Sequence, residues 1–278
     1  MQADGYKLVR MTELLVSSGD GRPVTALDEG SGPNLLVVHP GGGAVTTWDG
    51  VAARLVDDFR VVRIRRRIYV PEADIALPHS MSIEASDIVA VAGLLEPPVL
   101  LVGHSSGAVA ALEAALLDPS AFAGLVLYEP PMPTKELTAG TAGPRARAAL
   151  DRGDPVEAMR IHMRDIVRMP ANMVEAMFAD QCARAAFSTY AAPQIADNEA
   201  IDALGVGVDR FATLGIPTTL VAGELSPAHL RERLADIATV LPDARIVTLA
   251  GQGHTAHLHA PDTLADTIRE MARRTLHP

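Results

Sequence analysis

The sequence predicts an α/β fold in which a mostly parallel sheet is covered by helices on both faces and carries a helical cap. Short, continuously apolar runs alternate with amphipathic stretches along most of the chain, a pattern typical of buried parallel strands and their crossover helices. The alternation stops once, between residues 131 and 213, where the sequence is rich in Ala and Met and has no strand pattern. We therefore expect a core of residues 1–130 and 214–278 and a cap of residues 131–213.

The elements of the core follow from local patterns. The first thirty residues predict a hairpin, since two strand-like segments flank Gly19-Asp20-Gly21, a strong turn signal. Further strands are expected at the apolar runs, at residues 34–39, 59–64, 97–104, 122–129, 217–224 and 244–251. Helices are expected at residues 82–95, 106–117, 227–241 and 261–274.

The bulk composition excludes several classes of protein. The chain has 278 residues, a formal net charge of −10 and a pI near 5.3, so we expect no nucleic-acid or anionic-membrane partner. The one basic run, Arg63 to Arg67, is interpreted as a strand end and loop, with an anion site as the alternative. A single cysteine, Cys182, excludes an intrachain disulfide. The N-terminus lacks the apolar core of a signal peptide and the longest apolar run is too short to span a membrane, which predicts a cytoplasmic protein.

The strongest functional signal is the segment Gly103-His104-Ser105-Ser106-Gly107, a G-x-S-x-G motif between an apolar strand and a helix of small residues. In that context the serine sits on a strained strand-to-helix turn, with its hydroxyl exposed at the carboxyl edge of the sheet. Ser105 is therefore the predicted nucleophile. The alternative is a Gly-rich turn in which a serine caps the helix.

A second glycine-rich segment, HPGGG at residues 39–43, follows another buried strand. A developing oxyanion needs backbone N–H donors that side chains do not obstruct, and glycines provide them. Pro40 has no N–H, so Gly41 or Gly42 is the expected first donor. The N–H of Ser106, the residue after the nucleophile, is the expected second donor. The alternative is a flexible loop.

His254 lies in a Gly-flanked loop between the last strand and an amphipathic helix. From this loop a general base reaches the serine at the same edge of the sheet. His257 and His259 complete an H-x-x-H-x-H spacing, but no carboxylate or cysteine pattern accompanies it, so we interpret them as structural. No metal site is expected.

Together these segments resemble the α/β-hydrolase superfamily over nearly the whole chain. The resemblance includes the hairpin, HPGGG, GHSSG, the helical insertion and the GQGH loop, in the family's order of serine, cap and histidine. The lipase-type H-G-G-G motif is matched only in part, because Pro40 replaces its first glycine. The resemblance implies that no cofactor is needed and that an acyl-enzyme forms: Ser105 attacks a carbonyl, His254 takes and returns its proton, and water releases the product.

The acid of the triad has two candidate positions. Most members of the superfamily carry it after the strand that follows the cap, where this chain has Glu224 and, at the position expected for an aspartate, Ser226. A second branch, which includes haloalkane dehalogenases and zearalenone lactonases, carries it at the end of the preceding strand. This chain has Glu129 there, 24 residues after Ser105.

Glu129 is the preferred acid. The strands that bear Ser105 and Glu129 should be neighbours, about 4.8 Å apart, and both residues then emerge at the carboxyl edge, where such sheets bind ligands. Glu224 is the alternative, and a third possibility is that neither glutamate serves, with Glu129 a loop anchor before Pro130.

A serine nucleophile argues against dehalogenase or epoxide-hydrolase chemistry, which uses a carboxylate. The expected substrate is an ester, thioester or lactone of a neutral, largely apolar small molecule, and the lactonase resemblance suggests macrolactones. Met132, Met159 and Met163 are candidate pocket-lining residues, because methionine adapts to irregular apolar shapes; the alternative is a place in the hydrophobic core.

Other functions are compatible with the same residues. The chain could be a hydrolase-like ligand receptor, or a cyclase, lyase or acyltransferase, since this scaffold hosts many chemistries. The expected partner is in each case a small molecule, and a homodimer is compatible with the sequence.

Overall fold

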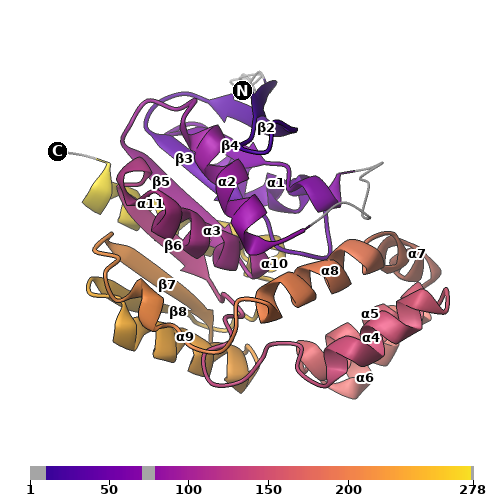
Figure 1. The fold of residues 1–278 in the computed structure, drawn as a ribbon. Coiled ribbons are helices and arrows are strands. Elements are labelled where there is room, and N and C mark those ends of the chain that lie inside the picture. The colour runs from indigo at the N-terminus through magenta and orange to yellow at the C-terminus, as the bar shows by residue number, and fades with distance from the viewer. Residues whose placement is uncertain (1–10, 71–78, 277–278) are drawn as a thin grey trace, which may run out of the picture.

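The computed structural model describes residues 11–70 and 79–276. Within these residues one sheet has the strand order β1-β2-β4-β3-β5-β6-β7-β8 (Figure 1). The strands are β1 (Thr12–Ser17), β2 (Pro23–Gly30), β3 (Asn34–Val38), β4 (Arg60–Ile64), β5 (Val99–His104), β6 (Gly124–Tyr128), β7 (Thr218–Gly223) and β8 (Ala244–Leu249). β2 is antiparallel to β1 and β4, and the other pairs are parallel. The predicted, mostly parallel sheet is confirmed.

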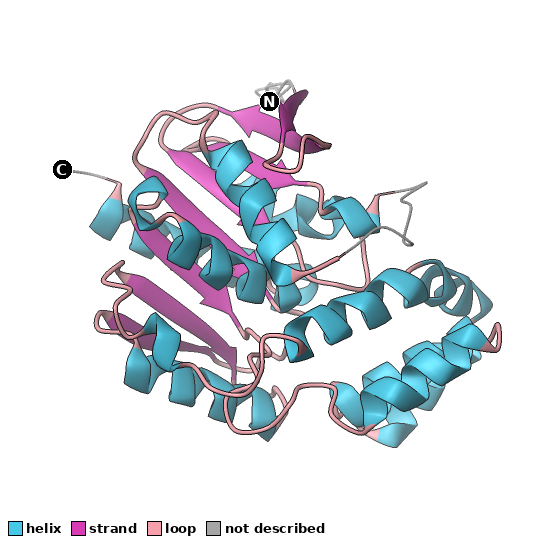
Figure 2. Ribbon diagram, in the orientation of Figure 1, coloured by secondary structure: helices cyan, strands magenta, loops and turns pink. Residues whose placement is uncertain are grey.

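Helices cover both faces of this sheet (Figure 2). The helices of the core are α1 (Asp49–Leu55), α2 (Met81–Ala92), α3 (Ser106–Leu117), α9 (Ala228–Val240), α10 (Ala256–His259) and α11 (Pro261–Thr275). Successive strand residues face opposite sides. Leu36 and Val38 belong to the hydrophobic cluster that includes residues of α2, α3 and α9, whereas Leu35 and Val37 belong to the one that includes residues of α1 and α11. No helix in the described ranges is both long and apolar enough to cross a membrane.

The N-terminal hairpin is present as β1 and β2, joined through the predicted turn. The start of the predicted first strand, residues 8–10, lies outside the described residues. The sequence patterns did not indicate helix α1, which buries Val51 and Leu55. They did not indicate the short helix α10 either, whereas α2, α3, α9 and α11 lie within a few residues of their predicted positions.

The segment between β6 and β7 forms the helical insert that the sequence predicts. Its helices are α4 (Ala142–Asp151), α5 (Pro155–Ile161), α6 (Ala171–Ala179), α7 (Gln181–Thr189) and α8 (Ala191–Asp202). They pack through two hydrophobic clusters of their own, and α8 contacts α3 of the core (Figure 1). The boundaries of the cap at residues 131 and 213 stay a prediction. Met132 and Phe211 lie inside these boundaries but pack in a hydrophobic cluster of the core.

Gly107 gives a test of the packing between α3 and β3. A Cβ at this position would lie 2.4 Å from the carbonyl oxygen of His39 and 2.6 Å from that of Val38. Gly107→Ala should therefore force the helix away from the strand and lower the free energy of unfolding by about 1–3 kcal/mol, as measured by urea denaturation. Gly215→Ala is the matched control, because nothing lies within 4 Å of its Cβ position. Equal stability of the two variants would contradict this account.

Candidate active site

Ser105 occupies a strained turn between β5 and α3. Its backbone has φ 53° and ψ −126°, a conformation that residues with a side chain rarely adopt. Its N–H donates to the carbonyl oxygen of Tyr128 at 2.8 Å, and α3 begins at the next residue. A Cβ on Gly103 would lie 2.6 Å from the Cα of Ala108, so glycine is needed where strand and helix meet. These are the features of a nucleophile turn that the G-x-S-x-G motif predicts.

Glu129 leaves the end of β6, the strand next to β5. Its backbone is also left-handed, with φ 45°, and its N–H donates to the carbonyl oxygen of Val221 at 3.1 Å. The carboxylate is fully buried: Oε1 accepts the N–H of Gly223 at 2.7 Å, and Oε2 lies 2.6 Å from Nδ1 of His254. Both oxygens thus have the partners that a buried carboxylate requires. The structure brings Glu129 and His254 together.

The contact with Glu129 fixes the tautomer of His254. An ionised carboxylate can only accept, so Nδ1 carries the proton and donates it. Nε2 of the neutral ring is then an acceptor, which is the state that a general base needs. Within residues 11–70 and 79–276, the side chains of Ser105 and His254 form no hydrogen bond with each other. In enzymes the distance between a nucleophile and its general base often shortens only when the substrate binds.

The residues directly before Ser105 and Glu129 hold the loop of His254. The hydroxyl of Tyr128 donates to the carbonyl oxygen of Gly253 and accepts the N–H of Ala256 at 3.2 Å. Nε2 of His104 donates to the carbonyl oxygen of His254 at 3.0 Å. His104 and Tyr128 pair across β5 and β6, and their rings stack with centroids 4.4 Å apart. One cross-strand pair therefore fixes the histidine loop relative to both strands.

The loop after β7 has a different role in this structure. Glu224 accepts the N–H of Gly251 at 2.7 Å, and the N–H of Leu225 donates to the carbonyl oxygen of Gln252 at 2.8 Å. Ser226 is buried, and its hydroxyl has no hydrogen-bond partner among the described residues. Glu224 and Leu225 therefore brace the neighbouring loop, and within the described ranges neither Glu224 nor Ser226 is hydrogen-bonded to the ring of His254.

Gly41 and Gly42 follow β3 and approach the start of α3. Gly42 has φ 74°, in the region that favours glycine. A Cβ on Gly41 would lie 2.5 Å from Oε1 of Gln194, 2.7 Å from the hydroxyl of Tyr69 and 3.1 Å from Oγ of Ser106. A side chain at position 41 would therefore have to displace these neighbouring side chains. The structure brings Gly41 next to Ser106. That their backbone N–H groups donate to an oxyanion stays a prediction.

Beside this loop lies a buried cluster of charged groups that the sequence patterns do not predict. The side chain of Arg66 is fully buried and forms ion pairs with Glu84 at 2.9 Å and Asp197 at 2.6 Å. It also donates to Oγ of Ser106 at 2.8 Å. The hydroxyl of Tyr69 donates to Asp197 at 2.9 Å. The cluster joins the end of β4, α2, α3 and the cap helix α8.

A second set of hydrogen bonds lies within the cap, between α8 and the end of α5. The amide of Gln194 donates to Asn198 at 3.1 Å, and the amide of Asn198 lies 3.0 Å from Nδ1 of His162. His162 begins a π-helical turn, His162–Ile166, that follows α5. Burial lowers the pKa of His162 to about 4, so the ring is neutral at neutral pH. The cap is therefore polar where it faces the Gly41 loop.

The three methionines predicted to line the pocket lie in hydrophobic clusters. Met132 packs in the core cluster with α2, α3 and α9, Met159 packs inside the cap, and neither has exposed surface. Met163 is partly buried against the same cap cluster. A side chain without accessible surface cannot line a cavity that is large enough for water. Of the three methionines, only Met163 has accessible surface that a ligand could contact. Their role in substrate binding stays a prediction.

His257 and His259, which share the H-x-x-H-x-H spacing with His254, have different surroundings. His257 is buried between Trp48 and His104, with ring centroids 6.1 Å and 4.5 Å away, and burial lowers its pKa to about 3. His259 is exposed. Throughout the described ranges, no group of three His, Cys, Asp or Glu side chains is placed to hold a metal ion.

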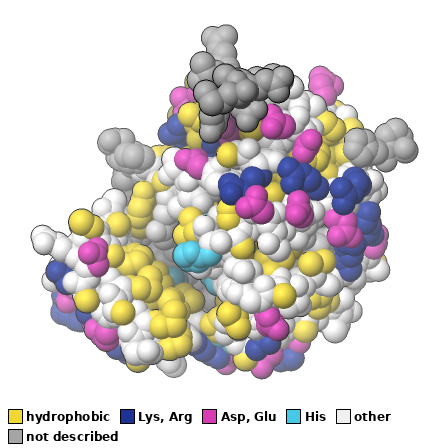
Figure 3. Space-filling model, turned by 180° about the vertical axis from the view of Figure 1, so that it is seen from behind, with side chains coloured by type: hydrophobic (Ala, Val, Ile, Leu, Met, Phe, Trp, Pro, Cys, Tyr) yellow, Lys and Arg dark blue, Asp and Glu magenta, His cyan; other side chains and the backbone are white. Residues whose placement is uncertain are grey.

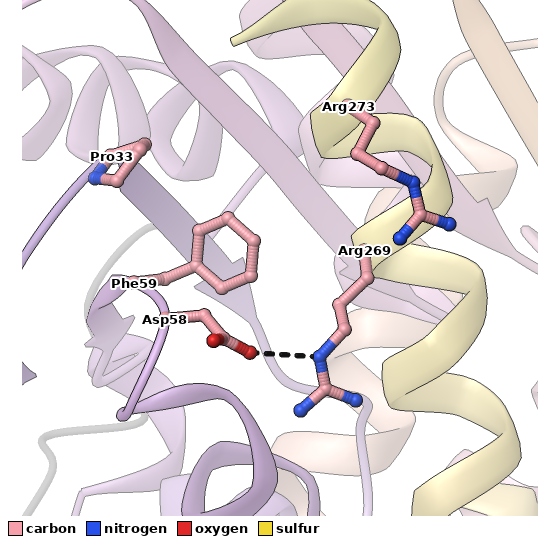
Figure 4. A pocket seen from close by; sticks show the side chains of 5 residues that line it. All are labelled: Pro33, Asp58, Phe59, Arg269 and Arg273. Atoms are coloured by element: carbon pink, nitrogen blue, oxygen red, sulfur yellow. Dashed lines mark hydrogen bonds and ion pairs between the residues drawn. The ribbon is translucent and has the colours of Figure 1, made fainter. Parts of the chain in front are cut away.

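A surface cavity of about 360 Å³ lies elsewhere on the core (Figure 4). It is lined by Pro33, Asp58, Phe59, Arg269 and Arg273. Pro33 and Phe59 directly precede β3 and β4, so the cavity lies at the amino ends of the parallel strands. Ser105 follows the carboxyl end of its strand, and the cavity is therefore separate from the candidate site.

Comparison with known proteins places the chain in a family. The sequence model of the alpha/beta hydrolase family matches residues 35–267, and this range includes every residue of the candidate site. The chain belongs to the alpha/beta hydrolase family. Its sheet and the insert after β6 are accordingly the core and cap of an α/β-hydrolase fold.

Several solved structures share this fold. An alpha/beta hydrolase from Sphaerobacter thermophilus is 27% identical, with 93% of this chain and 99% of that chain covered and a TM-score of 0.79. A thermophilic esterase from Thermogutta terrifontis is 22% identical, with coverage of 95% and 98% and a TM-score of 0.69. Naproxen esterase from Bacillus subtilis is 15% identical, with coverage of 95% and 92% and a TM-score of 0.68. At these two lower identities the likeness shows the fold alone.

Curated relatives match a shorter segment. Proteins named probable oxidoreductase EphD, from Mycobacterium bovis and Mycobacterium tuberculosis, are 35% identical over 106 residues. This segment is 36% of the present chain and 18% of those proteins, so the chain matches less than a fifth of their length.

Buried neutral histidines predict a stability that falls in acid. Burial lowers the pKa of His39 and of His257 to about 3, whereas an unfolded histidine titrates near about 6.5. Between these values the unfolded chain binds more protons, so the free energy of unfolding decreases as pH falls through this window. Tm measured from about pH 8 to about pH 4 should fall mainly below about pH 6.5.

His257→Phe tests this assignment, because it retains a ring against Trp48 and removes a titrating group. Its Tm should depend less steeply on pH than that of the wild type. Parallel Tm curves for the two proteins would exclude His257 as a source of acid sensitivity.

Proposed function

We propose that the protein is a serine hydrolase that cleaves an ester or lactone of a neutral, largely apolar small molecule through an acyl-enzyme. The observation that carries this proposal is the 2.6 Å contact between Glu129 and Nδ1 of His254, on the sheet edge where Ser105 occupies its strained turn. The esterases from Thermogutta terrifontis and Bacillus subtilis support the reaction class, because they share the fold.

Each residue has a defined role in the proposed reaction. Ser105 Oγ attacks the carbonyl carbon while Nε2 of His254 takes its proton, and the buried carboxylate of Glu129 stabilises the imidazolium that forms. The N–H of Ser106 and that of Gly41 or Gly42 donate to the oxyanion. Collapse of the tetrahedral intermediate expels the alcohol, which receives the proton from His254. Water then attacks the acyl-enzyme by the same sequence of proton transfers.

The proposed substrate is largely apolar. Hydrophobic side chains gather beside exposed histidine side chains on the face shown in Figure 3, and an apolar surface of this kind favours an apolar ligand. A carboxylate after β6 combined with a serine nucleophile is the arrangement for which the chain resembles zearalenone lactonases. We therefore propose a lactone as the first substrate to examine, with simple esters as the alternative.

Ser105 is tested with a fluorophosphonate probe. The probe should label Ser105, as read by peptide mass spectrometry, and Ser105→Ala should lose the label and lower ester turnover by about 10⁴-fold or more. Label that persists in the variant would assign the nucleophile to another residue. Reaction in isotopically labelled water separates hydrolysis from cyclase or transferase chemistry, because only hydrolysis places solvent oxygen in the released acid.

The acid is tested by comparing two glutamine variants. Glu129→Gln retains the shape but loses the charge that stabilises the imidazolium, so kcat at neutral pH should fall by about 10-fold to 10⁴-fold. Glu224→Gln is the matched control and should fall much less, and Ser226→Ala should be nearly silent. Steady-state kinetics on an activated ester, with Tm as a check on folding, gives the comparison. The reverse order of effects would move the acid to the loop after β7.

A further inference from the structure

We propose that Arg66 is a positioning residue for the oxyanion hole and that it couples the hole to the cap helix α8. The inference rests on the proposed function, since it concerns the groups that would donate to the oxyanion. Arg66 contacts both halves of the hole and the cap at once: its backbone reaches the Gly41 loop, and its side chain reaches Ser106 and Asp197.

The first link runs through the backbone of Arg66. Its N–H donates to Nε2 of His39 at 3.4 Å, and Nδ1 of His39 donates to the carbonyl oxygen of Pro40 at 2.8 Å. A carbonyl oxygen only accepts, so Nδ1 must carry the proton and Nε2 must accept. A neutral imidazole therefore ties Arg66 to the peptide bond that directly precedes Gly41.

The second link runs through the guanidinium group. Nη1 of Arg66 donates to Oγ of Ser106 at 2.8 Å, and Ser106 is the residue whose N–H is the other proposed donor. This hydroxyl also lies 3.1 Å from the Cβ position of Gly41, so it packs between the two halves of the hole. Arg66 thus fixes the first residue of α3 against the glycine loop.

The third link reaches the cap. Nη2 of Arg66 pairs with Asp197 on α8 at 2.6 Å, and Nε pairs with Glu84 on α2 at 2.9 Å. Burial opposes ionisation of Asp197, but the charges of Arg66 and His79 outweigh it and hold its pKa below its usual range. A displacement of α8 therefore acts on Arg66 through a charged contact and, through Arg66, on Ser106.

Stability alone does not explain a cluster of this kind. Taking ions out of water costs about as much as their attraction returns, and apolar side chains of similar volume are often as stabilising. The neighbouring Arg67 already anchors the same turn through Asp87 at 2.6 Å, in a more exposed position. Arg66 differs from Arg67 in that it is fully buried and contacts Ser106.

The test compares two matched substitutions, Asp197→Asn and Asp87→Asn. Each removes the charge of a buried aspartate that pairs with one of two consecutive arginines, but only Asp197 pairs with Arg66. The measurements are Tm, kcat and KM for p-nitrophenyl acetate, and the Kd of phenylboronic acid. The boronic acid forms a tetrahedral adduct on the nucleophile and therefore reports on the oxyanion hole.

Asp197→Asn should lower kcat and weaken boronic-acid binding by about tenfold or more, with KM changed by less than about twofold, since a lost oxyanion donor costs about 10²–10³-fold. Asp87→Asn should lower Tm and leave both quantities unchanged. If both variants change only Tm, or if kcat falls equally in both, Arg66 has a structural role and the proposal is wrong.

Ser106→Ala covers the case in which Asp197→Asn does not fold. It removes Oγ but keeps the backbone N–H and every charge of the cluster. Its kcat should fall by about threefold to tenfold, less than the loss of a whole donor, and Ser106→Thr should recover part of that loss. A Ser106→Ala variant with unchanged kcat would overturn the positioning role.

Failure of the proposed function has a separate signature, namely a wild-type protein that neither turns over esters nor takes the fluorophosphonate label at Ser105. The coupling is then read by backbone hydrogen exchange. Asp197→Asn should accelerate exchange both in α8 and in residues 104–109, whereas Asp87→Asn should accelerate neither. Acceleration in α8 alone would show that the cap and residues 104–109 are not coupled.

Discussion

The pairing of His104 with Tyr128 across β5 and β6 is the constraint on which the candidate site depends. It places the next residue of each strand, Ser105 and Glu129, side by side at one edge of the sheet, and the paired rings also hold the loop of His254. A slip of one residue would turn every side chain of a strand to its other face. The site therefore inherits its geometry from the hydrogen-bonded register of the sheet.

The sheet and the turn of Ser105 could be predicted because local patterns determine them. Continuous apolar runs identify strands buried on both faces, and glycines on either side of the serine permit the close contact of strand and helix. The contact of Glu129 with His254 is harder to predict. Glu129 and Glu224 each follow an apolar strand at the same edge, and which carboxylate reaches the histidine depends on its backbone angles and on loop packing. The resemblance to the second branch of the superfamily and the expected pairing of the two strands favoured Glu129, and the structure gives Glu129 the contact.

The residues around the site could not be predicted from local sequence patterns. A run of arginines at residues 63–67 is typical of a strand end and loop, yet Arg66 is buried because its partners come from segments 18, 40 and 131 residues away. The methionines of the cap show a similar limit. Residue type made Met159 a candidate either for the pocket or for the hydrophobic core, but it does not say which neighbours cover the side chain, and Met159 packs inside the cap itself.

The buried charges of Arg66, Glu84 and Asp197 also limit which substitutions this sequence can accumulate during evolution. Loss of Glu84 or Asp197 alone would leave Arg66 with uncompensated charge in the interior, at a cost of about 3–5 kcal/mol, which is a large part of the roughly 5–15 kcal/mol that stabilises a domain. Replacement of all three by apolar residues of matching volume need not harm the fold. Among descendants of this protein we therefore expect the three positions to change together or not at all. A residue of the core and one of the cap, 131 positions apart, would then evolve as a single unit.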